Sequence, residues 1–528
     1  MNESFRRSMA WLHTWAGLLV GWVSFFIFLT GTAGYFDTEI DRWMQPERPL
    51  SATQMTSAEA IEVGLQRLRD QAPYAVRWFV APPTGRDNPN LRVYWQERPA
   101  AEGLRGAEQR EILDSITGDP VGYRDTAGGQ FLYKMHYELH YLPSAVANWI
   151  VGIATMLMLV AIVTGVITHR RIFRDFFTFR LRRGQRSWLD IHNLLGVLAL
   201  PFHLMITYSG LVFFAYLYMA PIIGATYGTE GRHEFFAEMS PGAARVEAAD
   251  VAAPLAAIGP LLAEAERRWG EEQVREIDIR HPGDANARFI LRRDQQGLTR
   301  RGALLIFDGV SGIVLEATEP APSAPKAVRE TLLGLHEGLF ADTALRWLYF
   351  LAGLMGTSMI GAGLVLWTAK RRTKSGDTFG FQLVERLNIG TIVGLPVAIA
   401  AYFWANRLIP VGIEGRAAWE AHAMFIAWAI MLLHAFLRPA SRGWAKQLWV
   451  AAAAFGLLPF LNALTTNKHL GVTLPAGAWE LAGFDLTVLA FGIAFAITAW
   501  RIGRRRRSDR EHDKRAWTPA HQETEAAE

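Results

Sequence analysis

Residues 12–17 have the sequence Leu-His-Thr-Trp-Ala-Gly, and residues 191–196 have the sequence Ile-His-Asn-Leu-Leu-Gly. Both stretches begin a long apolar segment, and in both the histidine lies 18 residues before another glycine. The histidines are His13 and His192, and the later glycines are Gly31 and Gly210. Two membrane-type segments with matching histidines indicate an internal repeat.

A second pair of histidines supports the repeat. His140 lies 25 residues before Gly165, and His336 lies 25 residues before Gly361. The duplicated region covers about residues 5–373. Paired imidazoles on membrane helices are what a b-type haem requires, because its iron takes one axial nitrogen from each side.

The composition limits the possible chemistry. The chain has 528 residues, is 51% hydrophobic and contains no cysteine. Disulfides, thiolate-bound clusters, all-cysteine zinc sites and covalently attached c-type haem are therefore excluded. The formal charge of +4 is small. A basic C-terminal tail next to a membrane segment is expected to contact anionic lipid rather than nucleic acid.

Apolar runs of about 20 residues can cross a bilayer as helices. The sequence predicts eight, and Arg and Lys follow the second, fourth, sixth and eighth. Because such residues stay on the cytoplasmic side, we expect both termini in the cytoplasm. The eight runs lie at about residues 11–36, 146–168, 190–219, 345–368, 388–408, 418–437, 447–466 and 481–502.

The predicted fold is an all-α polytopic membrane protein with two small α+β domains outside the membrane. Each of these domains is expected to have a helix followed by short strands and an Asp-x-x-Ser/Thr-Gly turn. The predicted parts are the first membrane segment (1–36), the first external domain (37–145), the second membrane segment (146–168), a basic loop (169–189), the third membrane segment (190–219), the second external domain (220–344), the fourth membrane segment (345–368), a C-terminal four-helix module (374–502) and a basic tail (503–528).

Within the external domains, the expected helices lie at 56–68 and 253–269. The expected strands lie at 75–80, 91–96, 111–114, 274–279, 288–292 and 303–307, and the turns at 114–118 and 308–312.

These features together resemble the PepSY-associated transmembrane family, which includes iron-regulated bacterial inner-membrane proteins and ferric-siderophore reductases. The matching motifs are the His-x-x-x-x-Gly starts, the Thr/Ser-Gly ends, the Leu-His before the returning helices and the Asp-x-x-Ser/Thr-Gly turns. The resemblance covers about residues 5–373. It implies that the chain lies in a bacterial inner membrane, that the external domains are PepSY-like and that electrons pass through haem from the cytoplasmic to the periplasmic side.

The repeat predicts two haem b groups, one between His13 and His192 near the cytoplasmic face and one between His140 and His336 near the periplasmic face. Three other histidines are alternative ligands. His203 follows His192 by 11 residues and so returns to nearly the same helix face. His136 is one turn before His140, and His169 lies among arginines, where it suits a haem or a propionate.

No nucleotide-binding or flavin motif is present, so electrons are expected from quinol or a separate cytoplasmic reductase. The leading hypothesis is a haem-dependent oxidoreductase that reduces a periplasmic ferric siderophore or other ferric chelate for iron uptake, because Fe(II) is held more weakly than Fe(III) by hard oxygen donors. Catalytic residues cannot be named from the sequence. The alternatives are a non-enzymatic protein whose PepSY domains bind a partner, and a permease component of iron uptake.

Overall fold

The computed structural model describes residues 3–48, 55–86, 90–100, 106–114, 117–169, 184–228, 231–239, 246–294, 297–298, 303–318 and 323–522. The chain divides into two compact units. The helical unit comprises Met1–Pro46, Arg124–Leu204 and Leu348–Glu528, and the sheet unit comprises Glu47–Tyr123 and Met205–Trp347. Most of the predicted basic loop, residues 170–183, lies outside the described residues.

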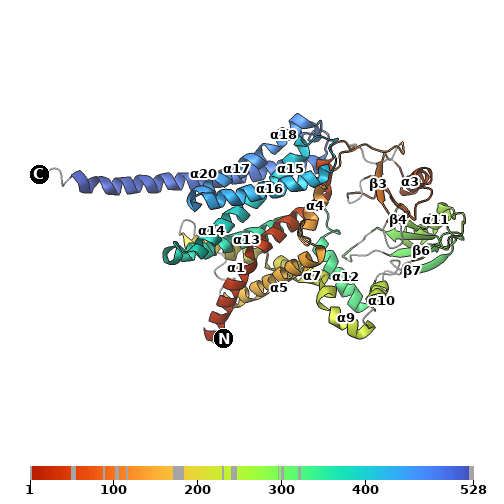
Figure 1. The fold of residues 1–528 in the computed structure, drawn as a ribbon, viewed down its shortest axis with the longest axis horizontal. Helices are drawn as coiled ribbons and strands as arrows, with labels where there is room; N and C mark the ends of the chain where they lie inside the picture. The colour runs from red at the N-terminus through yellow and green to blue at the C-terminus, as the bar shows by residue number, and fades with distance from the viewer. Residues whose placement is uncertain are drawn as a thin grey trace. The chain divides into compact units, whose positions relative to one another are not determined.

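The helical unit is built from long helices and a few short ones (Figure 1). Two helices, α7 (Leu200–Phe213) and α13 (Thr343–Ser375), cross the boundary between the units. The other helices of the unit are α1 (Glu3–Gly34), α2 (Asp37–Met44), α4 (Gly128–Met135), α5 (Ser144–Thr168), α6 (Gln185–Leu198), α14 (Phe379–Ile392), α15 (Gly394–Leu408), α16 (Arg416–Leu437), α17 (Ala440–Gly456), α18 (Leu458–Thr465), α19 (Leu470–Thr473) and α20 (Trp479–Gln522).

Seven segments of the described chain are long and apolar enough to cross a membrane, and α6 with α7 makes an eighth if this bent pair is one span. The predicted polytopic helical fold is thus confirmed for seven runs, and the remaining run takes the form of the bent pair. The bend is 70° and follows Leu198. Pro201 is the second residue of α7 and lacks a backbone N–H, a known cause of such breaks.

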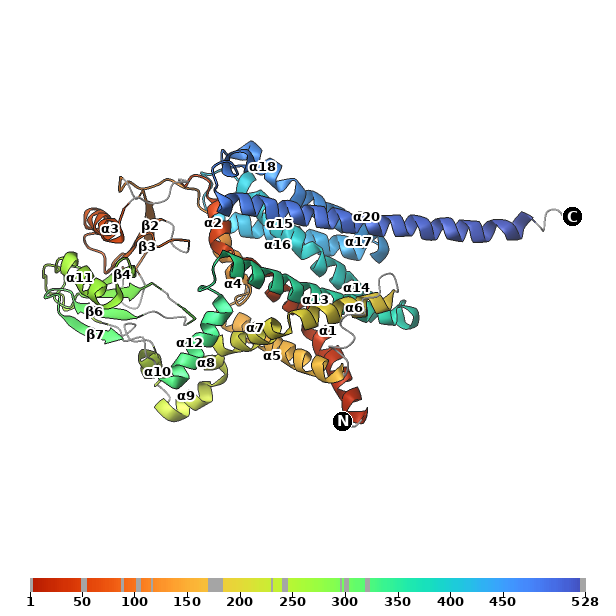
Figure 2. The same cartoon turned by 180° about the vertical axis from the view of Figure 1, so that it is seen from behind.

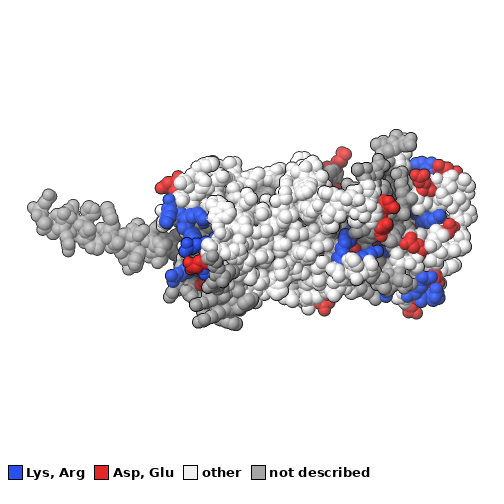
Figure 3. Space-filling view, turned by 90° about the horizontal axis from the view of Figure 1, so that it is seen from below, with Lys and Arg blue, Asp and Glu red and all other residues white. Residues whose placement is uncertain are grey.

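The outer surface of the helical unit fits a bilayer. Figure 3 shows a wide band of this unit that is almost free of charged side chains, with Lys and Arg gathered at the end from which the C-terminal helix extends. Large apolar side chains such as Leu19 and Leu437 are 71% exposed. An apolar surface of this extent suits lipid contact, so the chain is a multi-pass membrane protein.

The sheet unit contains one antiparallel sheet of seven strands in the described residues, in the order β3-β2-β1-β4-β5-β6-β7. Six of the strands match the predicted ones, and the last was not predicted. The strands are β1 (Arg77–Ala81), β2 (Leu91–Gln96), β3 (Glu108–Leu113), β4 (Val274–Arg280), β5 (Arg288–Arg293), β6 (Leu304–Asp308) and β7 (Val314–Thr318).

Two helices, α3 (Ser57–Gln71) and α11 (Ile258–Trp269), lie on the same side of the sheet (Figure 2). Both confirm predicted helices. Thr56 is the N-cap residue of α3 and forms a capping box with Glu59. Alternate strand side chains pack against both helices in one apolar core, as the period of two in a strand requires.

The two halves of the sheet come from different parts of the chain. Strand β1, from the first external segment, pairs with β4, from the second. At this junction Arg77 donates two hydrogen bonds to Asp278, at 2.6 and 2.8 Å, and Asp278 is 1% exposed. The strands predicted for two domains therefore join in one sheet, and the PepSY-like character of each half stays a prediction.

The remaining described helices of the sheet unit are shorter. They are α8 (Ala215–Tyr218), α9 (Ala220–Tyr227), α10 (Arg232–Met239) and α12 (Ala324–Glu337). The last of these carries His336 in its final turn.

The helices α14–α20 form the C-terminal module. They pack against the rest of the helical unit through one apolar core, in which Tyr402, Met424 and Leu458 are fully buried. Phe26 of α1 stacks on Trp428 of α16 with ring centres 5.6 Å apart. The C-terminal module is thus packed directly on the helices of the predicted repeat.

Candidate haem site in the helical unit

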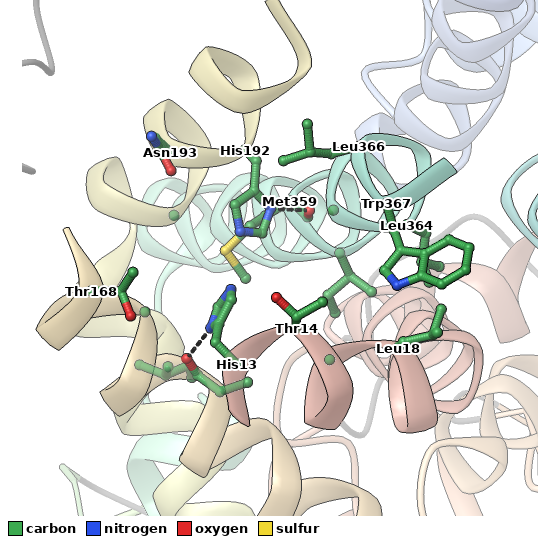
Figure 4. Close-up of a pocket in the computed structure, with 18 of the residues that line it drawn as sticks. His13, Thr14, Leu18, Thr168, His192, Asn193, Met359, Leu364, Leu366 and Trp367 are labelled. Atoms are coloured by element: carbon green, nitrogen blue, oxygen red, sulfur yellow. Dashed lines mark hydrogen bonds between the residues drawn. The ribbon is translucent and has the colours of Figure 1, made fainter. Parts of the chain in front are cut away.

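A cavity of about 340 Å³ lies among α1, α5, α6, α7 and α13 (Figure 4). Its lining is mostly apolar, and it includes four of the seven histidines that the sequence analysis singled out. These are His13, His169, His192 and His203. A mostly apolar cavity with a few polar groups is typical of a cofactor site.

Two of these histidines are held in the same way. His13 Nδ1 lies 2.8 Å from the carbonyl oxygen of Ala161, and His192 Nδ1 lies 2.8 Å from that of Met359. A carbonyl can only accept, so each Nδ1 carries the proton and donates. In a neutral imidazole this leaves the lone pair on Nε2, the arrangement that metal-binding histidines use.

The two imidazoles face each other across the cavity. Their ring centres are 6.1 Å apart and their planes make an angle of 71°. In Figure 4, the nitrogen of each ring that makes no drawn hydrogen bond points towards the other ring. The structure thus places His13 and His192 next to each other, as their matching positions in the repeat predict.

Glycines give both rings their space. A Cβ atom added to Gly165 would lie 3.1 Å from His13 Cε1, and one added to Gly363 would lie 3.1 Å from His192 Cε1. Gly165 lies four residues after Ala161, and Gly363 lies four residues after Met359, and these are the two residues whose carbonyls hold the rings. The equal spacing from His140 and His336 predicts that Gly361 is the counterpart of Gly165, but Gly361 faces Phe25 instead. A shift of two residues between the copies hid this equivalence.

A third imidazole lies deep in the cavity. His203 is 1% exposed, and the backbone carbonyls of Ala352 and Gly196 lie within reach of its ring. Ser24 Oγ, which also lines the cavity, is buried with no hydrogen-bond partner among the described residues. Buried polar atoms normally have partners, so this hydroxyl is available to a ligand of the cavity.

The cavity also has a cationic end. His169, Lys370 and Arg371 line it together, and the guanidinium of Arg371 lies 4.2 Å from the ring centre of Trp367. Among the described residues that line the cavity there is no Asp or Glu. An anionic group of a ligand would be favoured at this end. The arginines of the predicted loop, Arg170 and Arg171, lie outside the described residues.

The two histidines before α5 have different surroundings. His136 packs on Gly31, whose added Cβ would lie 3.4 Å from the histidine Cβ. Desolvation lowers the pKa of His136 to about 4. His140 is exposed and stacks on Phe425 of the C-terminal module, with ring centres 5.8 Å apart. The adjacent Tyr141 hydroxyl lies 2.6 Å from Nδ1 of His422.

In the sheet unit, His336 Nδ1 lies 2.9 Å from Ser209 Oγ, and that hydroxyl is also 2.6 Å from the carbonyl of Met205, to which it can donate. His336 therefore lies against the Ser-Gly end of its copy. His136 lies against the Thr-Gly end of the other copy. By these local contacts His136, rather than His140, is the repeat counterpart of His336.

A network of buried polar side chains in the helical unit was not foreseen. Glu420 accepts hydrogen bonds from Thr126 Oγ1 at 2.5 Å and from the backbone N–H of Ala127 at 3.1 Å, and it pairs with Arg416. Further members connect it to α2 and α20: Asn406, Arg407, Asn462, Asp485 and Trp43. The sequence does contain a signal for this network, since several of its charged residues lie at the ends of apolar runs.

The geometry defines a class: a multi-pass membrane protein with a mostly apolar cavity among its membrane-type helices, lined by two oriented histidines. Within the described residues, no group of three or more His, Asp or Glu is placed to hold a metal ion. A site of this kind therefore depends on two imidazoles, which are sufficient for the iron of a haem.

The chain belongs to the PepSY-associated TM region family, which matches residues 10–370. It is also 27% identical over 388 residues to a protein of Pseudomonas aeruginosa described as uncharacterized, covering 71% of this chain and 94% of that protein. The family match confirms the resemblance drawn from the motifs and ends before the C-terminal module begins.

Proposed function

We propose that the cavity binds a b-type haem, which His13 and His192 would hold through Nε2. The observation that carries the proposal is the pair of facing imidazoles, each fixed by a backbone carbonyl through Nδ1. A haem, when bound, supplies a one-electron iron centre inside the membrane. The chain's own residues fix the rings, leave Nε2 unprotonated and exclude water.

The separation of the two rings fits this role. Metal–imidazole nitrogen bonds are about 2 Å long, and with ring bonds of about 1.33 Å each nitrogen lies about 1.1 Å from its ring centre. Two imidazoles on opposite sides of one metal therefore have centres about 6 Å apart. The observed separation is 6.1 Å. The cationic end at Lys370 and Arg371 suits the propionates, and His203 is the alternative ligand in the same cavity.

The second haem stays a prediction. It was expected between His140 and His336, which belong to different units. Local packing favours His136 over His140 as the partner in the repeat, because His136 lies against Gly31 as His336 lies against Ser209. Exposure and stacking on Phe425 give His140 surroundings that differ from those of His336.

As a function, we infer transfer of electrons across the membrane to a ferric chelate, such as a ferric siderophore, with quinol or a cytoplasmic reductase as donor. Each iron takes up one electron, and the Fe(II) formed is released more readily from hard oxygen donors. Family membership supports the proposal, as does the combination of an intramembrane cavity with a sheet unit large enough to carry a docking surface. A partner-binding protein without haem is the competing function.

Purified full-length protein tests the haem directly. A pyridine haemochromogen assay should give a b-type spectrum, and His13→Ala or His192→Ala should lose the same haem. His434→Ala is the matched control, because His434 also lies on a membrane helix but contacts Gln447 of the C-terminal module. Wild-type protein without haem would refute the proposal and favour the partner-binding function.

The acceptor needs a separate measurement. Dithionite-reduced protein in detergent should be reoxidised by a ferric siderophore, with the appearance of Fe(II) trapped by a chromogenic chelator. Protein that stays reduced with every ferric chelate, yet passes electrons to a periplasmic protein, would be an electron-transfer intermediate rather than a terminal reductase.

A further inference from the structure

Asn388 is a buried amide between two helices of the haem site. It lies on α14, in the C-terminal module beyond the family match, and is 1% exposed. Its Oδ1 accepts a hydrogen bond from Trp22 Nε1 of α1 at 2.9 Å, and its Nδ2 donates one to the carbonyl of Leu364 of α13 at 3.0 Å. One side chain therefore connects α1 to α13.

The connection lies beside one of the close contacts between these helices. A Cβ atom added to Gly21 of α1 would come within 2.7 Å of Leu364 Cδ2, and both residues line the cavity. An amide at this depth in an apolar core is costly unless its groups are satisfied. Both Oδ1 and Nδ2 have partners, so Asn388 favours one particular spacing of α1 and α13.

That spacing bears on the two imidazoles. His13 is carried by α1, and the carbonyl that holds His192 belongs to Met359 of α13. Leu364 follows, by one residue, the glycine that makes room for His192. A change in the distance between α1 and α13 would therefore move one imidazole relative to the other.

We propose that Asn388 is a positioning residue for the His13–His192 pair, and that the C-terminal module acts through it as a scaffold for the haem site. The proposal rests on the haem function proposed above. It gives the C-terminal helices, which the family match does not cover, a role in setting the geometry of the site.

The first test is spectroscopic and uses full-length protein. Asn388→Leu removes both hydrogen bonds at similar volume, and Trp22→Phe removes only one. Gln447→Leu is the matched control, because Gln447 is a fully buried amide of the same module that bonds to Met431 and contacts His434 there.

We expect Asn388→Leu to bind haem with an altered low-spin EPR spectrum and a shifted midpoint potential, and Trp22→Phe to shift both in the same direction by less. Gln447→Leu should match the wild type. A wild-type spectrum and potential in Asn388→Leu, or an equal shift in Gln447→Leu, would overturn the proposal. If Asn388→Leu does not fold, Trp22→Phe decides.

The second test does not depend on haem. The chain has no cysteine, so Gly21→Cys with Leu364→Cys reports the α1–α13 spacing through disulfide formation. The pair should cross-link readily, and more slowly when Asn388→Leu is added but not when Gln447→Leu is added. Unchanged cross-linking in Asn388→Leu would refute the positioning role. Normal cross-linking behaviour in a protein that binds no haem would refute the proposed function alone.

Discussion

The imidazoles of His13 and His192 show how backbone atoms can prepare a binding site. In both cases a helix carbonyl takes the Nδ1 proton, and a glycine one turn further on gives the ring its space. Neither arrangement needs an acidic partner, which would be costly at this depth. The rings are thus oriented before any ligand enters.

A methyl group at Gly165 should disturb His13. Its Cβ would lie 3.1 Å from His13 Cε1, closer than ordinary contact. Overpacking costs about 1–3 kcal/mol, so we expect Gly165→Ala to bind haem roughly 5- to 150-fold more weakly. Haem titration of apo protein measures this. Gly483→Ala is the control, since Gly483 lies on the membrane helix α20, is not part of the cavity lining, and an added Cβ would meet no described atom within 4 Å.

At the scale of elements, the helices and strands of the sheet unit follow their sequence patterns closely. Strand β2 has the predicted bounds, and α11 ends at the predicted Trp269. Strand β7 was missed because Val314–Thr318 is short and none of its residues is fully buried. The pairing of β1 with β4 was also missed, since alternation within a strand does not identify a partner about 190 residues away.

The candidate site was predicted only in part, because sequence patterns do not show contacts between distant segments. Spacing identified His13 and His192, because both lie at the start of apolar runs. It missed Gly363 and Asn388, whose roles arise from contacts between helices that are distant in sequence. A polar residue in the apolar run 388–408 was the available signal for Asn388.

The ion pair between β1 and β4 should stabilise the junction of the sheet. Asp278→Ala removes the buried carboxylate that accepts two hydrogen bonds from Arg77. Breaking a buried pair costs about 3–5 kcal/mol; since Arg77 is 31% exposed, we expect about 2 kcal/mol. Hydrogen exchange of the β1 and β4 amides measures the loss. Glu276→Ala, which removes a more exposed partner of Arg292, should cost less.

The turn after β6 should contribute a pH-dependent stability. Hydrogen bonds from the N–H and hydroxyl of Ser311 hold the pKa of Asp308 below its usual value. A depressed carboxyl pKa stabilises the fold above the unfolded value of about 3.9, and this contribution is lost as the pH falls through the folded pKa. Asp308→Asn should therefore unfold at a lower temperature than the wild type at pH 7, and this difference should be smaller at pH 3. Thermal scans of both proteins at the two pH values measure it. An equal loss at both pH values would contradict this.

At the scale of the whole molecule, the chain leaves the helical unit after Pro46 and returns at Arg124. The residues next to both of these points form hydrogen bonds within the helical unit. Gln45 Nε2 donates to the carbonyl of Arg124 at 3.2 Å, and Arg124 donates to that of Asn406 at 2.9 Å. The buried network around Glu420 therefore holds the segment that carries α4 and His136.

Glu420→Ala should destabilise this region strongly, because it leaves Arg416 buried at 0% exposure without its partner. The expected cost is about 3–5 kcal/mol. The double variant Arg416→Met with Glu420→Leu should be closer to the wild type, since no unpaired charge remains. Thermal unfolding in detergent compares the three proteins. A double variant less stable than Glu420→Ala would show that the charges themselves are required.

Strand pairing also bears on topology, because hydrogen-bonded strands must share one side of the membrane. Reporter fusions near residues 100 and 280 should therefore report the same compartment, which the basic residues predict to be the periplasm. Fusions near 180 and 375 should report the cytoplasm. A cytoplasmic result at 280 with a periplasmic one at 100 would be incompatible with the pairing of β1 and β4.

The junction between β1 and β4 also constrains biogenesis. Ribosomes deliver β1 long before β4, and two membrane segments, α5 and the bent pair α6–α7, lie between them in the chain. Until Val274–Arg280 reaches the same side of the membrane, the β1 edge has unpaired backbone groups, and exposed edges of this kind recruit other chains. The nascent protein should therefore depend on a chaperone of that compartment during the interval, and its production should fall in strains that lack one.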